Sequence, residues 1–285
     1  MKNTIITLLK FSLAAGLIYW LINSGKLDFA ILKDVLQEPL KILISLVGML
    51  FVLSLVNFRY SIILSHKSVV KIPLLKLLKY NWIGMFFNSV LPGSVSGDFV
   101  KIFYIKEEDK SLSNKFMLGS IFIDRVLGLF GLILSLGLFT LFNYSELSSF
   151  SPDVKQLLDL NLLLFVLVFI GVFSLFYFQK LPHTVLKPFR ELPLLNKILP
   201  KLLKIWDELC EFKTKMVTLT IISIFLQMTA VIIFWFLTKD FAVGNFELKY
   251  ALSIVPLGFV AISIPIAPSG LGVGHAAFHL SLIHI

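Results

Sequence analysis

Apolar residues fill long and nearly uninterrupted runs along most of this 285-residue chain, with short polar connectors between them. A transmembrane helix needs about 20 such residues to cross about 30 Å of hydrocarbon. The pattern therefore predicts an all-α fold, a polytopic transmembrane helical bundle. The first run lacks a small-x-small cleavage motif, so we interpret it as an uncleaved helix and not a signal peptide. The runs lie near residues 5–22, 40–64, 114–142, 160–178, 216–238 and 250–267.

Two apolar stretches, residues 77–97 and 265–274, are interrupted by prolines, glycines and polar side chains. Irregular backbone at membrane depth is stable only where protein or a water-filled cavity covers it. Interrupted segments in corresponding positions of two halves also indicate the binding site of a transporter. We therefore expect two re-entrant or broken helical segments in this bundle, and a carrier function.

The distribution of basic residues predicts how the chain crosses the membrane, because cytoplasmic loops are enriched in Lys and Arg. If residues 77–97 enter and leave on one side, the inside segments carry two, four, four and eight basic residues, 18 of the 26 in the chain. Six then lie outside. Full crossing by residues 77–97 would leave only nine inside, so we expect a re-entrant segment and a cytoplasmic N-terminus.

Two stretches have the pattern of interfacial helices, with apolar residues on one side and charged residues on the other. They are residues 27–38 and residues 196–212, and the second is basic. A basic amphipathic helix is suited to lie on anionic lipid at the cytoplasmic face. An ordinary solvated connector helix would show the same periodicity, so both interpretations stay open.

Composition agrees with a membrane protein. Hydrophobic residues make up 57% of the chain and charged residues 15%, whereas soluble domains are about 45–50% apolar and about 25% charged. The net charge of +9 indicates contact with anionic lipid headgroups and not with nucleic acid. The single cysteine, Cys210, excludes an intramolecular disulfide and a cysteine metal cluster. We expect a multi-pass protein of the cell membrane that binds no metal and no cofactor.

Asp124 and Arg125 lie about eleven residues into an apolar run, which at 1.5 Å per residue places them some 15 Å deep. Charges at this depth are costly, so they pair or face a cavity and usually mark function. Arg125 keeps its charge and must find an anion. The candidates are Asp98, Asp124 or a substrate phosphate, whose oxygens match the guanidinium fork. A purely structural ion pair is the alternative. We interpret Arg59, near the inner end of its run, as a snorkelling anchor.

The segment 92–98 would let the chain reverse at depth, because Gly93 and Gly97 permit close backbone approach. A helix that begins near Ser96 would present N–H groups to an anion. Asp98 would cap that helix in the alternative interpretation. Asn88 would satisfy freed backbone groups.

The second break, residues 265–274, holds a run of closely spaced glycines. It is a candidate binding loop, or a place where helices pack closely through small residues. His275 and His279 have the i, i+4 spacing of metal ligands, but no third ligand accompanies them. We therefore expect no metal site here.

Three motifs in this order resemble the lysylphosphatidylglycerol synthase transmembrane family, which is flippase-like. They are Asn88-x-x-Leu91-Pro92-Gly93-x-x-x-Gly97-Asp98, Asp124-Arg125-x-x-Gly128 and Pro268-Ser269-Gly270-Leu271-Gly272-Val273-Gly274. The resemblance covers most of the chain and implies a protein that moves a lipid with an anionic or modified headgroup between leaflets. The chain departs from the family pattern at Ser96, Lys101 and His275. We expect no aminoacyl-transfer domain and therefore no synthase activity. The candidate substrate-binding residues are Asn88, Pro92, Gly93, Gly97, Asp98, Lys101, Asp124, Arg125, Ser269, Gly270, Gly272 and Gly274.

The first hypothesis for function is thus a translocator for an anionic phospholipid or a polyprenyl-phosphate-linked lipid, whose partners are membrane lipids and a separate lipid-modifying enzyme. The alternatives are a membrane glycosyltransferase or lipid-modifying enzyme of the polyprenyl-phosphate type, and a non-catalytic assembly partner. Acidic residues in the 143–159 loop would mark the enzyme, but no donor site accompanies them. We expect residues 1–279 to form one transmembrane flippase-like domain, C-terminally truncated, and interpret residues 280–285 as a non-native tail.

Overall fold

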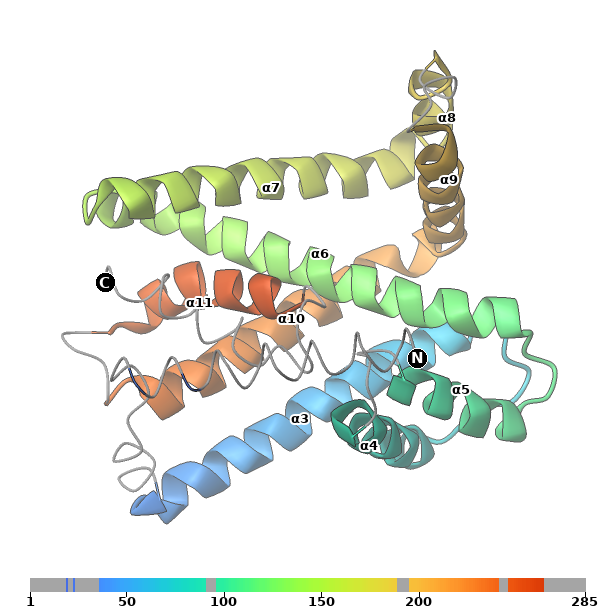
Figure 1. The fold of residues 1–285 in the computed structure, drawn as a ribbon, viewed down its shortest axis with the longest axis horizontal. Helices are drawn as coiled ribbons and strands as arrows, with labels where there is room; N and C mark the ends of the chain where they lie inside the picture. The colour runs from blue at the N-terminus through green and yellow to red at the C-terminus, as the bar shows by residue number, and fades with distance from the viewer. Residues whose placement is uncertain are drawn as a thin grey trace.

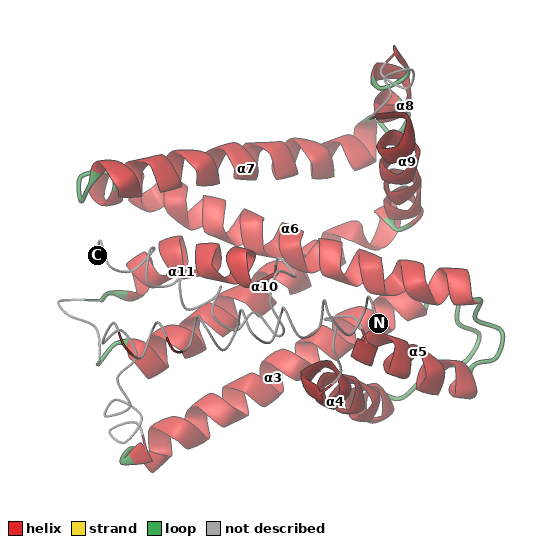
Figure 2. Ribbon diagram, viewed as in Figure 1, coloured by secondary structure: helices red, strands yellow, loops and turns green. Residues whose placement is uncertain are grey.

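The computed structural model describes residues 36–90, 96–188, 195–240 and 246–263, and the single positions 19 and 23. Every regular element within these ranges is helical, as the apolar pattern predicted (Figure 2). The predicted first helix, most of the 27–38 helix, the 265–274 break and the 280–285 tail lie outside the described residues. The helices are α3 (Pro39–Leu64), α4 (Leu74–Val90), α5 (Ser96–Glu108), α6 (Asn114–Leu147), α7 (Pro152–Tyr177), α8 (Leu181–Val185), α9 (Leu195–Glu211), α10 (Lys213–Thr238) and α11 (Leu248–Ser263).

The start of α7 corrects the predicted span near 160–178, and with it the predicted loop at 143–159. Ser151 caps α7, because its hydroxyl accepts a hydrogen bond from the Val154 N–H at 3.2 Å, and Pro152 stands at the first helical position, where it is well tolerated. The helix therefore begins well before the apolar run, and residues 148–151 alone connect α6 to α7.

Four of these helices are long and apolar enough to cross a membrane: α3, α6, residues 154–175 of α7, and α10. Half of the apolar window of α6 is buried in the protein, against 11% in α3 and α7. Figure 1 shows α6 running the length of the molecule between α7 on one side and α10 and α11 on the other. The central helix is therefore α6, and the outer faces of α3 and α7 are available to lipid.

Close contacts between α6 and α10 depend on a missing side chain at Gly131. A Cβ there would lie 2.4 Å from the Cβ of Ser223 on α10. Small residues at such crossings let helix backbones approach, which is the main source of packing energy between helices in lipid. The crossing brings Ser223 against α6 in the middle of the bundle.

The predicted broken segment 77–97 covers most of α4 and the first two residues of α5, two short helices that pack against each other. The remainder of α5 lies in what was predicted as a connector after residue 97. Both helices lie beside the end of the bundle at which α6 begins, and α4 is seen nearly end-on in Figure 1, across the direction of α6. A Cβ at Gly97 would lie 1.8 Å from the carbonyl oxygen of Gly84, so the two backbones touch. Asn88 accepts a hydrogen bond from the Gly97 N–H at 2.7 Å, as expected for a residue that satisfies freed backbone groups. Entry of this hairpin into lipid stays a prediction.

The predicted amphipathic helix at 196–212 is α9, which crosses the ends of α6, α7 and α10 at the same end as α4 and α5 (Figure 1). Trp206 anchors it by donating a hydrogen bond to the Gln179 carbonyl at 2.8 Å. Asp207 lies 2.7 Å from the ring of His183 in α8. The helix thus has the placement of an element that lies along the membrane surface.

Candidate functional site

The candidate site lies where the N-terminal turn of α5 meets α6. Helix α5 begins at Ser96, as predicted, and Asp98 sits in its first turn. The carboxylate of Asp98 forms an ion pair with the guanidinium of Arg125 from α6. The structure thus pairs Arg125 with Asp98, one of the two carboxylates predicted as its partners.

An open cavity of about 210 Å³ extends from this ion pair between α5 and α6. Asp98 and Arg125 form its polar end, and the remaining lining is apolar. Almost half of the Arg125 side chain is exposed, at 48%, against 20% for Asp98. We call this cavity the α5–α6 groove; its apolar walls are Phe99, Ile102, Leu118, Ile121 and Phe122.

Asp124, one residue earlier, points elsewhere and pairs with Arg59 of α3. The Arg59 Nε lies 2.9 Å from Asp124 Oδ1, and its Nη2 donates to the Asp124 carbonyl at 3.1 Å. Its Nη1 donates to the Ser223 hydroxyl at 2.9 Å. Arg59 is 4% exposed, so the interpretation of this residue as a snorkelling anchor is wrong. The reason is that a desolvated carboxylate and a hydroxyl on two other helices satisfy its donors inside the bundle.

Lys101 lies one turn after Asp98 on α5 and is buried, with 5% exposure. Its Nζ lies over the ring of Tyr60, 3.8 Å from the ring centre. The Tyr60 hydroxyl is 3.0 Å from the hydroxyl of Ser120 on α6. Lys101 therefore belongs to the interior of the α3–α5–α6 junction. The count of inside basic residues had included it in the connector that follows residue 97.

The predicted site residues are thus brought together in part. Asn88, Gly97, Asp98 and Arg125 meet at the α4–α5–α6 junction, while Asp124 faces α3. The other members of the prediction lie outside the described residues: Pro92, Gly93, Ser269, Gly270, Gly272 and Gly274, as do His275 and His279.

Sequence reasoning missed Arg59, Tyr60 and Ser223. A signal for Arg59 was present, because consecutive helical residues point about 100° apart. Asp124 and Arg125 cannot both face one partner, so each needed its own counter-charge, and Arg59 was the remaining basic residue within an apolar run.

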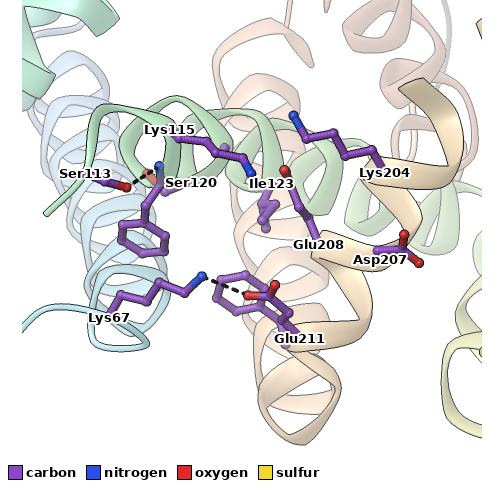
Figure 3. Close-up of a pocket in the computed structure, with 12 residues that line it drawn as sticks. Lys67, Ser113, Lys115, Ser120, Ile123, Lys204, Asp207, Glu208 and Glu211 are labelled. Carbon is purple, nitrogen blue, oxygen red and sulfur yellow. Dashed lines mark hydrogen bonds and ion pairs between the residues drawn. The ribbon is translucent and has the colours of Figure 1, made fainter. Parts of the chain in front are cut away.

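A second cavity, of about 250 Å³, lies between the first turns of α6 and one face of α9 (Figure 3). Lys67 and Glu211 form an ion pair of 3.1 Å at one side of it. Figure 3 shows Lys115, Lys204 and Glu208 pointing into the space from α6 and α9. Ser120 lines the inner wall of this cavity, which we call the inner-end pocket.

No group of three or more His, Cys, Asp or Glu side chains that could hold a metal occurs in the part of the chain that the structure describes. The arrangement instead combines an exposed guanidinium, a groove with apolar walls and a set of buried charges between helices.

These features define a polytopic α-helical membrane protein with a charge network at the junction of three helices. The chain belongs to the lysylphosphatidylglycerol synthase transmembrane region family, whose model matches residues 7–285. Comparison with curated proteins found no match, and neither did comparison with solved structures. The family and the membrane helices support a function connected with membrane lipids.

Proposed function

We propose that this protein moves a lipid with an anionic headgroup between the two leaflets, and that the α5–α6 groove receives that lipid. The cargo is a phospholipid or a polyprenyl-phosphate-linked lipid, because both present a phosphate next to apolar chains. The observation that carries the proposal is the groove itself, whose lining combines the half-exposed Arg125 side chain and Asp98 with apolar walls.

The groove matches the two parts of such a lipid. A guanidinium fork binds phosphate oxygens with two parallel hydrogen bonds. Phe99, Ile102 and Phe122 offer an apolar surface next to it, on which the first segments of an acyl chain can lie. Binding pockets commonly combine such apolar linings with a few placed polar groups.

The ion pair between Asp98 and Arg125 would allow a phosphate to bind and leave, because the two anions can exchange on one guanidinium. In the empty groove Asp98 neutralises Arg125, and an incoming phosphate would take its place. Asp124 is held by Arg59 through two contacts, so it stays in place while Asp98 is released. A carrier must bind cargo and let it go, and competition between two anions for one guanidinium allows both.

The enzyme alternative gains no support from the acidic residues at the opposite end of α6. Glu146 accepts hydrogen bonds from Lys249 at 2.9 and 3.0 Å, and Asp159 accepts one from Tyr144 at 2.6 Å. These carboxylates connect helices to one another. A lipid-carrying function gives the half-exposed Arg125 side chain and the apolar lining beside it a common role.

The test is headgroup transfer in proteoliposomes that carry fluorescent phosphatidylglycerol, followed by dithionite quenching of the outer leaflet. Arg125→Ala should lower the transfer rate at least tenfold while the protein still inserts and purifies as a folded species. Arg125→Lys should retain part of the rate, because it keeps the charge but loses the fork.

Lys249→Ala is the matched control, because it removes a cation from an ion pair at the far end of α6. Its transfer rate should equal that of the wild type. Transfer by Arg125→Ala at the wild-type rate would remove Arg125 from the mechanism and with it the proposal.

A further inference from the structure

The buried Lys101 has no carboxylate within ion-pair distance among the described residues. Its Nζ lies over the face of the Tyr60 ring. Both nearby carboxylates are already engaged, Asp98 with Arg125 and Asp124 with Arg59. A buried ammonium in this position is therefore one cation more than the surrounding anions can neutralise.

The charge of the junction can be counted from the groups that surround Lys101. Helix α3 supplies one cation and a phenol, α5 supplies one carboxylate beside the lysine itself, and α6 supplies a carboxylate and a cation. Helix α4 presents Gly84 toward the stem of Lys101. Among the described residues, three cations face two anions when Lys101 is protonated, and these groups together carry one positive charge. The groups are Arg59, Tyr60, Asp98, Asp124 and Arg125.

An unpaired buried charge is strongly disfavoured, and a lysine relieves it either by losing its proton or by gaining an anion. Arginine cannot use the first route. Lysine can, since its ammonium releases a proton readily when buried. In the empty site the first route is open to Lys101, and the arrival of an anionic headgroup opens the second.

We propose that Lys101 carries the proton that accompanies the lipid: neutral in the empty site, it becomes an ammonium when an anionic headgroup enters the α5–α6 groove. This inference rests on the proposed function and adds its coupling ion. The amine takes up one proton as the groove takes up one monoanionic phosphodiester, so the junction has zero net charge before and after. Transport of such a lipid is then electroneutral proton–lipid symport.

The structure offers Lys101 a connection to the inner-end pocket. Tyr60 lies between the Lys101 Nζ and Ser120. The Tyr60 hydroxyl is 3.0 Å from the Ser120 hydroxyl. Ser120 lines the pocket into which Lys115, Lys204 and Glu208 point (Figure 3). The flexible lysine stem needs only to turn from the ring face to the hydroxyl of the same ring to meet this path.

The first experiment measures proton uptake when purified protein in weakly buffered detergent solution binds phosphatidylglycerol, with a pH-indicator dye as the readout. Wild-type protein should take up about one proton per lipid bound. Lys101→Met, which keeps the length of the stem, should bind the lipid and take up none. Lys106→Met is the matched control, because Lys106 lies on the same helix and is partly exposed; it should behave as the wild type.

The second experiment measures transfer of fluorescent phosphatidylglycerol in proteoliposomes under an imposed pH gradient or an imposed membrane potential. Wild-type transfer should respond to the pH gradient and not to the potential, and Lys101→Met should lose that response. Tyr60→Phe keeps the ring and removes the hydroxyl, so it should slow the response without abolishing proton uptake.

The outcomes separate this inference from the proposed function. Lipid binding and transfer without proton uptake, or uptake retained in Lys101→Met, would overturn the role of Lys101 and leave the translocator intact. Absence of both binding and transfer in the wild type would overturn both. If Lys101→Met does not fold, the wild-type proton count decides alone.

Discussion

At the scale of single residues, two adjacent charges on α6 organise the protein by facing in different directions. Arg125 faces α5 and the groove, whereas Asp124 faces α3. Depth and charge could be predicted from the sequence, because both residues stand inside an apolar run. The Asp124–Arg59 pair was not predicted, since its members are 65 positions apart and the contact depends on how α3 and α6 pack.

Arg59→Leu should destabilise the fold far more than removal of the whole pair. The single change leaves the partly buried Asp124 without its counter-charge and Ser223 without its donor. Breaking a buried pair costs about 3–5 kcal/mol. Arg59→Leu/Asp124→Leu removes both charges and should recover most of that loss. Thermal unfolding in detergent measures the difference, and equal stability of the single and double variants would contradict the structural role of this pair.

At the scale of elements, the interrupted segment at 77–97 is the feature that sequence reasoning anticipated best. Proline and glycine positions predicted a break, and the second helix does begin at Ser96. The start of α7 was missed because polar residues follow Pro152, although the Ser-Pro pair is itself a helix-start signal. The length of an apolar run indicates which part of a helix can cross the membrane. The ends of the helix are set by its capping residues and can lie well outside that run.

Gly97→Ala should separate α4 from α5. The added methyl would lie 1.8 Å from the Gly84 carbonyl oxygen, which belongs to backbone and cannot move aside without shifting a helix. Overpacking of this kind costs about 1–3 kcal/mol. Gly171→Ala is the control, because nothing lies within 4 Å of a Cβ there. Proteolysis in the segment between the two helices should accelerate in Gly97→Ala alone, and equal resistance of both variants would count against the close contact.

Asp109 fastens the end of α5 to the segment that follows α3. Its carboxylate accepts hydrogen bonds from the Ser111 and Ser68 hydroxyls and from the N–H groups of Val69 and Ser111. These donors hold the pKa of Asp109 well below its usual range.

Since the folded pKa is depressed, the stabilisation is complete above the ordinary aspartate pKa of about 3.9 and is lost as pH falls toward the folded value. Asp109→Asn should therefore lower the melting temperature by a few degrees at every pH from 5 to 8, with a smaller difference below pH 4. A difference that grows on acidification would show that the carboxylate is not the stabilising form.

At the scale of the whole molecule, the basic residues predict one inner end. The end of α3, the start of α6 and the two helices α8 and α9 gather there in the structure (Figure 1). Lys101 is buried and no longer counts among the basic residues predicted on the inside. Even without it, far more basic residues are predicted on the inside than on the outside. The prediction of a transmembrane helical bundle and of its inner end follows from composition and charge. How deeply each helix is buried depends on helix packing, which cannot be read from a single sequence.

Cysteine labelling should place positions 71 and 106 on the same, cytoplasmic face, in a chain whose Cys210 is replaced by serine. Lys71→Cys and Lys106→Cys flank the α4–α5 hairpin, so a membrane-impermeant maleimide should reach both only after the membrane is opened. Lys155→Cys should react in intact cells. Reaction of positions 71 and 106 from opposite faces would show that the hairpin crosses the bilayer.

The length of α6 has a consequence for the route of the cargo. Its 34 residues span about 51 Å at 1.5 Å per residue, more than the roughly 40–45 Å of a whole bilayer. Arg125 stands about 8 Å on the N-terminal side of the helix midpoint, so with the predicted orientation the guanidinium serves the inner leaflet.

Beyond Arg125, α6 carries Ser135, Thr140 and Asn143, and the next charged residue is Glu146. Ser135 and Thr140 are buried, so on the proposed route α6 offers a headgroup that leaves Arg125 outward no charged side chain before Glu146. If the protein transports lipid as proposed, we expect the departure of the headgroup from Arg125 to be the slowest step.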